Sequence, residues 1–374
     1  MTEPSLSHAE PSTPSLRRAV TGPMLFLFIL GDVLGAGVYA LAGTIAGQVG
    51  GAIWVPLLVA LFFAMLTAGS YAELVTKYPH AGAASVFAEK AFKSPLISFL
   101  VGFCMLAAAV TSAAGLSLAF AGDYLAAFVN VSPHVLGAAL LAFYSFVGFE
   151  TSANLAEEIR GVRRIYPRAL FAALIVAGIV YMAVGVAASV VLPMDKLTAT
   201  SAPLLEVVRA SGLNIPPQLF AFIALVAVAN GALLTMVMAS RLTYGMARMG
   251  LLPEPLSRVL PKRRTPWVAI IASTAVAIAL TLTGTLAALA ETVVLLLLFV
   301  FLSTNLAVLV LRRDTIEEQH FRVPSWVPVL AIVSCLILLS QQSLDTWMRG
   351  GALIVLGMVL YGCNRLATPA VQAG

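Results

Sequence analysis

Two short segments, residues 31–37 and residues 145–150, each place a glycine break and one carboxylate inside otherwise apolar sequence. Glycine weakens a helix, and a carboxylate in hydrocarbon is costly. A helix that crosses a membrane must satisfy its own backbone, because lipid offers no hydrogen bonds. One early break and one in mid-chain therefore indicate discontinuous helices whose free backbone groups bind a small ligand near the bilayer midplane.

The first break offers backbone N–H groups and one acid. Gly35, Ala36 and Gly37 allow the backbone to unwind, and the half-helix that follows adds a partial positive charge, so a carboxylate is the natural ligand. Close helix packing through small residues is the alternative interpretation. Asp32, one turn earlier, is predicted to accept a hydrogen bond from an ammonium group or to carry a coupling proton. A carboxyl group satisfied by neighbouring helix ends and water is the alternative for Asp32.

The second break comprises Phe146, Val147 and Gly148, with Ser145 just before it and Glu150 just beyond it. Ordinary helix packing is the alternative for the side chains of this segment. Glu150 is a second candidate for the coupling proton. A carboxylate also caps the N-terminus of a following half-helix, and we prefer that structural interpretation.

The elements that must position these breaks are long apolar runs. Of the 374 residues, 60% are hydrophobic and only 10% are charged, against about 25% charged in soluble domains. We therefore expect an all-α integral membrane protein with about ten spans of roughly 30 Å of hydrocarbon. The runs lie near residues 22–47, 52–77, 95–128, 135–156, 168–193, 216–240, 267–287, 290–311, 326–342 and 350–366.

Positive charge gathers in every second connection, which predicts orientation rather than nucleic-acid binding for the net charge of +5. The alternation fits a cell-membrane protein with both termini in the cytoplasm. Residues 1–20 are predicted to be a disordered tail, residues 21–366 a single membrane domain, and residues 367–374 a second tail. The histidines and cysteines lack metal-ligand spacing and no phosphate-binding loop is present, so we expect no enzyme, metal, cofactor or ATP motor.

Four stretches, in order, resemble the amino acid–polyamine–organocation permeases and together cover most of residues 20–311. They are residues 31–39, residues 70–82, residues 143–150, and Ala156, Glu157 and Glu158 running into Arg164 and Pro167-Arg168. The resemblance implies a leucine-transporter-like bundle of five-plus-five helices in inverted repeat. It also implies an amino acid held between the break at residues 35–37 and the break at residues 146–148.

The chain departs from that pattern after its third span. Family members usually have twelve helices, whereas residues 21–128 provide a shortened first repeat of three helices, residues 135–311 a second repeat of five, and residues 326–366 two accessory helices. The family's fourth and fifth helices are therefore expected to be missing. So is the lysine that some proton-coupled members carry on the fifth.

Four charged residues near the basic connections, Glu73, Glu157, Glu158 and Arg164, are candidates for a salt-bridged inner gate. A solvated juxtamembrane cluster is the alternative. The expected function is secondary transport of an amino acid by alternating access, with proton coupling as a further hypothesis. A transport-deficient homologue that serves as a binding or partner subunit, or a non-functional remnant, is the second hypothesis, and a passive channel is the third. The sequence leaves the amino acid and the oligomeric state open.

Overall fold

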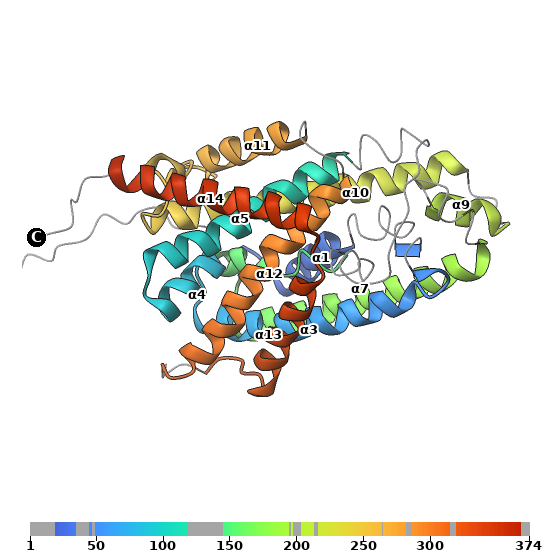
Figure 1. Cartoon of the computed structure of the whole chain (residues 1–374), viewed down its shortest axis with the longest axis horizontal. Coiled ribbons are helices and arrows are strands. Elements are labelled where there is room, and N and C mark those ends of the chain that lie inside the picture. The colour runs from blue at the N-terminus through green and yellow to red at the C-terminus, as the bar shows by residue number, and fades with distance from the viewer. Residues whose placement is uncertain are drawn as a thin grey trace, which may run out of the picture.

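The computed structural model describes residues 19–34, 45–46, 49–118, 145–193, 196, 203–212, 216–263, 265–281, 286–314 and 319–367. These residues form a bundle of helices (Figure 1). Within the described ranges the only strand-like pairing is an isolated bridge between Val20 and Ile159. The all-α class predicted from the sequence is therefore confirmed.

The helices carry the following bounds. They are α1 (Gly22–Val33), α3 (Trp54–Lys77), α4 (Ala83–Phe92), α5 (Pro95–Leu118), η2 (Thr151–Glu158), α7 (Val162–Val191), α9 (Pro203–Ala210), α10 (Pro217–Arg248), η3 (Glu254–Ser257), α11 (Trp267–Thr281), α12 (Leu286–Leu311), α13 (Trp326–Ser340) and α14 (Leu344–Ala367), where η marks a 3-10 helix.

Six of the described helices, α3, α5, α7, α10, α12 and α14, are long and apolar enough to cross a membrane. Three shorter apolar helices, α1, α11 and α13, fall on further predicted runs. The remaining run, near residues 135–156, is described only from residue 145, where turns lead into η2. The chain is accordingly a multi-pass membrane protein.

Three helices extend six or more residues past the predicted ends of their apolar runs. α7 begins at Val162 rather than near residue 168, α10 continues to Arg248 rather than ending near residue 240, and α14 begins at Leu344 rather than near residue 350. The apolar pattern stops where the hydrocarbon stops, whereas backbone hydrogen bonding continues into the polar interface. The predicted connection at residues 78–94 likewise contains a helix, α4.

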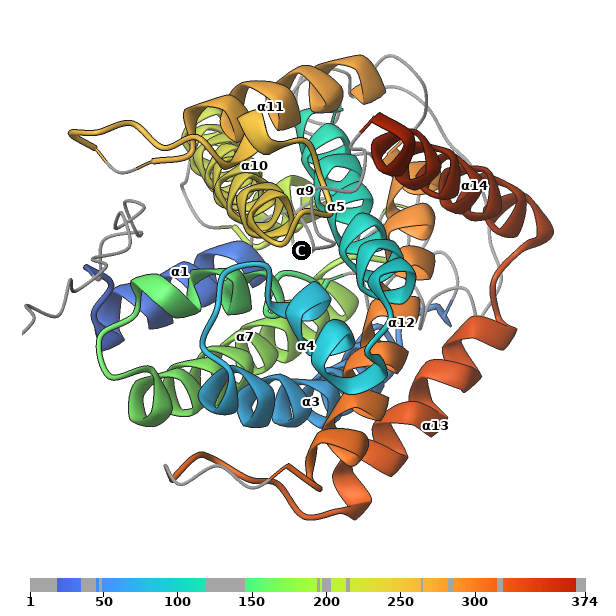
Figure 2. The same ribbon diagram turned by 90° about the vertical axis from the view of Figure 1, so that its left-hand side faces the viewer.

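One end of the bundle collects arginine and lysine side chains, and we call it the basic end. Its members Lys77, Arg163, Arg248 and Arg312 lie at the end of α3, the start of α7, the end of α10 and directly after α12. Figure 2 views the bundle from the end where α4 lies, with α1 beside α7 and α10 beside α11. α13 and α14 lie on the outside of the bundle in the same view.

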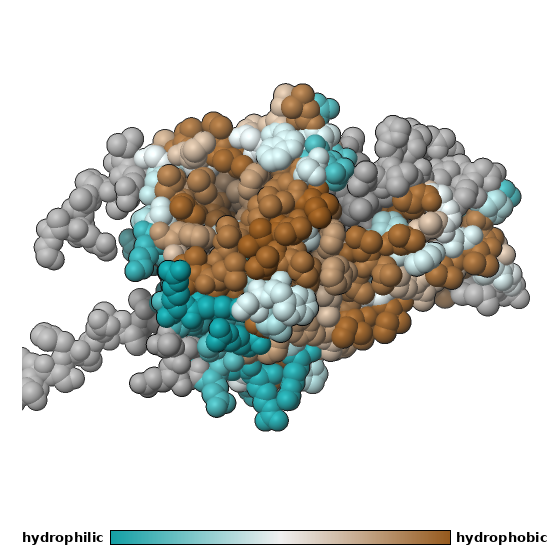
Figure 3. All heavy atoms as spheres, turned by 60° about the horizontal axis from the view of Figure 1, so that its bottom comes forward, coloured by the Kyte–Doolittle hydropathy of each residue, from teal (hydrophilic) through white to brown (hydrophobic). Residues whose placement is uncertain are grey.

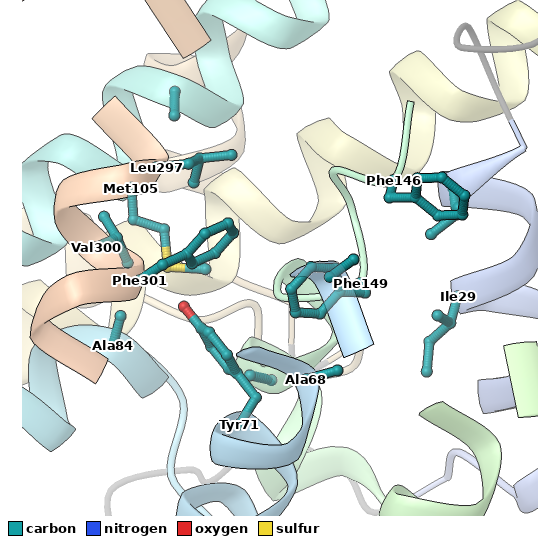
Figure 4. Close-up of a cluster of buried hydrophobic side chains, with 14 of the residues drawn as sticks. Ile29, Ala68, Tyr71, Ala84, Met105, Phe146, Phe149, Leu297, Val300 and Phe301 are labelled. Atoms are coloured by element: carbon teal, nitrogen blue, oxygen red, sulfur yellow. The ribbon is translucent and has the colours of Figure 1, made fainter. Parts of the chain in front are cut away.

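A buried aromatic cluster holds the second break against the bundle. The ring of Tyr71 on α3 meets the rings of Phe149 and Phe301 edge-on, with centroids 5.9 and 6.0 Å away, and Phe149 stacks on Phe301 at 5.5 Å (Figure 4). Such pairs contribute about 0.5–1.5 kcal/mol each beyond the apolar area that they bury. The residues after the break are thus fixed to both α3 and α12.

The outer surface is apolar along most of the bundle. Figure 3 shows a broad hydrophobic surface on one face, with hydrophilic residues gathered toward one end. Large apolar side chains such as Ile179, Val190 and Phe222 are more than 60% exposed. Exposure on this scale fits helices that face lipid, because hydrocarbon solvates these side chains.

Candidate functional site

The end of α1, which leads into the first predicted break, lies next to the second predicted break. α1 ends at Val33, directly before the first break, while Gly35, Ala36 and Gly37 fall outside the described residues. Gly148, in the second break, has φ +123°, and a Cβ built on it would lie 3.1 Å from the carboxyl carbon of Asp32. Glycine is therefore required at this position both by the backbone conformation and by the approach of Asp32.

Asp32 joins three elements through its carboxylate. The Thr151 hydroxyl of η2 donates to Oδ2 at 2.6 Å, and the Thr235 hydroxyl of α10 donates to Oδ1 at 3.2 Å. Asp32 is only 8% exposed, and no ion pair to it occurs among the described residues. A buried carboxylate without a cation is costly, so this position favours a bound proton or the ammonium group of a ligand.

The Glu150 side chain folds back onto the backbone of the second break. Its Oε2 accepts a hydrogen bond from the Gly148 N–H at 3.0 Å, and the side chain is buried. This geometry resembles a cap on the interrupted backbone. Glu150 also lines the same cavity as Asp32.

The described residues around Asp32 enclose a cavity of about 30 Å³, room for about two water molecules. Its walls differ in chemistry. Acidic, hydroxyl and backbone groups of α1, the second break, η2 and α10 form one side, and mostly apolar side chains of α5 and α12, including Met105 and Leu297 but also Ser112, form the other. The arrangement can hold a charged group at one end and an apolar group at the other.

Of the predicted binding residues, Val147, Gly148 and Asp32 line this cavity, and Ser145 and Phe146 do not. Phe146 is fully buried with its ring 4.9 Å from the ring of Tyr181 on α7. Ser145 is also buried.

Tyr181 lies between the end of α1 and the start of the second break. Its hydroxyl lies 2.7 Å from the carbonyl oxygen of Val33 and 2.7 Å from that of Ser145. One hydroxyl proton can be donated to only one of these carbonyls at a time. The ends of the two interrupted segments are therefore tied through a single donor on a third helix.

A buried ion pair lies between the cavity and the basic end. Arg241 Nε on α10 donates to Glu158 Oε1 at 3.0 Å, with the side chains 12% and 15% exposed. Arg241 follows Thr235 by six residues, so the pair lies about 9 Å from Thr235 along the α10 axis. Beside it the Val20 N–H donates to the Glu158 carbonyl at 2.9 Å. The Arg160 N–H donates back to the Val20 carbonyl at 3.0 Å.

Glu157, next to Glu158, contacts the segment between α3 and α4. Its Oε1 accepts a hydrogen bond from the Ala81 N–H at 3.1 Å and lies 3.8 Å from His80 Nδ1. Burial alone raises the pKa of Glu157. Hydrogen bonds from His80 and Ala81 and the charge of Arg248 outweigh burial and hold the pKa below its usual value. A Cβ on Gly245 would come within 2.7 Å of the Ala81 carbonyl oxygen, so glycine permits this close approach of α10.

The other two predicted gate residues lie elsewhere at the basic end. Glu73 forms a two-pronged pair with Arg312, at 2.9 and 2.7 Å, and also accepts the Val323 N–H at 2.9 Å. Glu73 thus connects α3 to α12 and to the segment before α13. Arg164 is exposed, and no ion pair joins it to Glu157 or Glu158 in the part of the chain that the structure describes.

Sequence reasoning missed several of these partners. Thr151 directly follows Glu150, and Thr235 is a polar residue within an apolar run, so both carried a weak local signal. Arg241 carried no signal for its partner, although its guanidinium pairs with Glu158 inside the bundle. Tyr181 carried no signal, because a tyrosine near the middle of an apolar helix is ordinary core packing.

Comparisons with known proteins agree with this architecture. A model of the amino acid permease family matches residues 126–349. The branched-chain amino acid permease BcaP of Bacillus subtilis is 24% identical over 432 aligned positions that cover 93% of each chain. An uncharacterized transporter of Mycobacterium tuberculosis is 31% identical over 64% of this chain and 54% of that protein. The serine/threonine exchanger SteT of Bacillus subtilis is 26% identical over 63% of this chain and 56% of that protein.

The alignments also differ in extent. The chain spans about half the length of the mycobacterial and SteT relatives that it matches. With BcaP, at least 58 of the 432 aligned positions are gaps in this chain, because the chain has only 374 residues.

Proposed function

Because this chain belongs to the amino acid permease family, and so to the amino acid–polyamine–organocation transporters, we propose that it is a secondary active transporter that moves an amino acid across the cell membrane by alternating access. The observation that carries the proposal is the contact of Asp32, near the end of α1, with Gly148 of the second break, beside a cavity that they share with side chains of α5 and α12. Family relatives named for branched-chain amino acids and for serine and threonine support an amino acid as the substrate class.

We place the substrate between the first break, at residues 35–37, and the second break, at residues 146–148. The ammonium group would bind near Asp32, whose two oxygens already accept hydrogen bonds from neutral hydroxyl groups. The side chain would face Met105 and Leu297 across the cavity. The cavity of about 30 Å³ is too small for an amino acid, so binding requires the walls to separate.

The gate proposal rests on Glu158 and Arg241. In this proposal, their ion pair, the Val20–Ile159 bridge and the Glu157 contacts together close the path that a substrate would take from the cavity to the basic end. Release toward that end would require the Glu158–Arg241 pair to break. Positive charge at this end favours a cytoplasmic location for it and for both termini. Glu73 and Arg164 have no part in this gate in the present conformation.

Proton coupling is proposed for Asp32, with Glu150 as the second candidate. Asp32 is buried, has no cationic partner among the described residues and lies at the meeting point of three elements. A proton on Asp32 would change its hydrogen bonds to Thr151 and Thr235. That change is a physical route from protonation to movement of η2 and α10.

The deciding experiment is uptake of a mixture of labelled amino acids into proteoliposomes that contain the purified chain, with and without an inward proton gradient. Saturable accumulation that the gradient stimulates is the expected result. The variant Asp32→Asn is expected to abolish gradient stimulation, whereas Asp345→Asn, an exposed acid at the start of α14, should leave it intact. Gradient-driven uptake that survives in Asp32→Asn would show that Asp32 does not carry the proton.

A second function is favoured by one observation, the 58 or more positions that this chain lacks in its alignment with BcaP. A permease missing part of its scaffold can retain a binding site and serve as a binding or partner subunit. In that case the purified chain would bind an amino acid in equilibrium dialysis, but proteoliposomes would show no accumulation. A correctly inserted chain with neither binding nor uptake would be a non-functional remnant.

A further inference from the structure

A large open pocket lies at the basic end, apart from the cavity between the breaks. It has a volume of about 620 Å³ and lies between the first turns of α7 and the segment at residues 319–321. The lining residues are Arg163, Arg164, Pro167, Arg168, Phe171, Gln319, His320 and Phe321. Three arginines, one histidine and no acid occur in this described lining.

The pocket is built rather than accidental. Arg163 Nε donates to the Thr76 carbonyl at 3.2 Å, and the Phe321 N–H donates to the Thr76 hydroxyl at 3.1 Å, so the end of α3 holds both walls. The rings of Phe171 and Phe321 meet with centroids 5.8 Å apart. The lining of the pocket therefore combines a held arginine, Arg163, with a pair of packed aromatic rings.

The electrostatics of the pocket favour an anion. Burial, and then the charge of Lys77, lower the pKa of His320, with smaller effects in the same direction from Arg322 and Arg163. Glu73 opposes them, but its carboxylate is already paired with Arg312. The arginines also lie at the positive end of the α7 dipole, where cations are disfavoured and an anion is stabilised.

The exposed face of α7 continues from the arginines into an apolar stripe. Arg164 and Arg168 are exposed one helical turn apart, and Ile175 and Ile179, further along the same face, are 48% and 63% exposed. Residues at this spacing lie above one another on a helix. A ligand with an anionic head and a long apolar tail would match this order, head at the arginines and tail along the isoleucines.

We propose that this pocket binds the head group of an anionic phospholipid, with one acyl chain along the exposed stripe of α7. Arg164 and Arg168 contact the phosphate, and Phe171 packs against the glycerol and the first methylene groups. Basic pockets between membrane helices are suited to such head groups. A soluble phosphate would have the same charge but would make no use of the apolar stripe.

The test uses the full-length chain purified in a neutral detergent and titrated with phosphatidylglycerol or phosphatidylcholine, with bound lipid counted by native mass spectrometry. The test variant is Arg164→Gln/Arg168→Gln. The matched control is Arg258→Gln/Arg263→Gln, which removes two exposed arginines from the connection between α10 and α11. Each basic residue near a lipid surface contributes about fivefold in affinity, so the test variant should bind phosphatidylglycerol about 30-fold more weakly.

The expected pattern is preference for phosphatidylglycerol over phosphatidylcholine in the unmodified chain and in the control, and loss of that preference in the test variant. Equal binding of phosphatidylglycerol by the test variant and the control would overturn the proposal. Displacement of the lipid by an equal concentration of glycerol 3-phosphate would also overturn it and indicate a soluble anion.

A third variant addresses the chain's own acids. Glu317 and Glu318 precede Gln319 in sequence and lie outside the described residues. Lipid preference in the unmodified chain, retained in Glu317→Gln/Glu318→Gln, supports the proposal. Preference that emerges only in Glu317→Gln/Glu318→Gln would mean that these carboxylates neutralise the pocket, and the proposal would fail.

Discussion

Replacing Arg312 with alanine removes the residue that connects α12 to α3 and to the start of α13. Its guanidinium donates to both oxygens of Glu73 at 2.9 and 2.7 Å. It also donates to the Val323 carbonyl at 2.6 Å and to the Ser325 hydroxyl at 2.8 Å. In Arg312→Ala the Glu73 carboxylate keeps only the Val323 N–H among these donors, at 2.9 Å. We expect the start of α13 to detach from α3 more often in this variant.

The magnitude follows from burial. The side chains of Glu73 and Arg312 are 3% and 11% exposed, and removing one partner from a buried ion pair costs about 3–5 kcal/mol because a charge remains unpaired. The retained Val323 N–H places this case at the lower end, about 3 kcal/mol. At 1.4 kcal/mol per factor of ten, local opening should become roughly 150-fold more frequent.

The assay places a thiol under α13. Val327 in the first turn of α13 is 9% exposed, and its Cγ1 would lie 3.3 Å from a Cβ at Gly69 of α3. In a chain with Cys104, Cys335 and Cys363 replaced by alanine, Val327→Cys reacts with a membrane-permeant maleimide only when α13 moves away from α3. The labelling rate under native conditions therefore reports the opening free energy.

The matched control is Arg313→Ala, which removes the exposed neighbouring arginine. It should leave the labelling rate of Val327→Cys within about twofold of the parent, as surface substitutions usually do. Adding Glu73→Gln to Arg312→Ala should slow labelling again, because it removes the unpaired carboxylate. If Arg312→Ala labels no faster than Arg313→Ala, the interpretation of this ion pair as the attachment of α13 is wrong.

Three further outcomes are expected. Gly148→Ala forces an unfavourable backbone conformation and a contact with Asp32 at 3.1 Å, so it should weaken amino acid binding by at least about tenfold in equilibrium dialysis. Tyr181→Phe removes a buried donor and should lower uptake about tenfold at equal protein content, and unchanged uptake would contradict a role for the hydroxyl. The pKa of Glu157 is held below its usual value, so its contribution to stability is present at neutral pH and is lost as the pH falls through that lowered pKa. The difference in thermal unfolding between the parent and Glu157→Gln should accordingly shrink as the pH falls through the lowered pKa.

The helices were predictable because apolar runs of membrane length have few alternatives to an α-helix. The ends of the helices were not, as α7 and α10 illustrate. Residues 162–167 contain three charged or proline positions, which are typical of a connection, yet they form the first turns of a helix that emerges into the interface. The hydropathy of a segment indicates whether lipid or water surrounds it. It does not indicate whether backbone hydrogen bonding continues the helix beyond the hydrocarbon.

The glycines and acidic residues of the site could be predicted from the sequence, but the residues that contact them could not. Asp32 and Gly148 stand out because each is expensive in an apolar helix unless something requires it. The contact of Asp32 with Thr235, and that of Glu158 with Arg241, join residues more than 80 positions apart in the chain. One sequence cannot specify which of several basic residues meets a given acid, because that depends on the rotation and tilt of α10 against η2.

The hydrogen bond from Thr151 to Asp32 and the Val20–Ile159 bridge have a joint mechanical consequence. Two segments joined at one point can rotate about it, whereas two joints make them move as one rigid body. α1 and the segment at residues 145–159 are joined toward the basic end by the bridge and near the cavity by the Thr151–Asp32 hydrogen bond. The Tyr181 proton is not a further joint between them, because it is donated to only one of the two carbonyls at a time. Any opening toward the basic end must therefore tilt the two segments together away from α10, or first release one of the two joints.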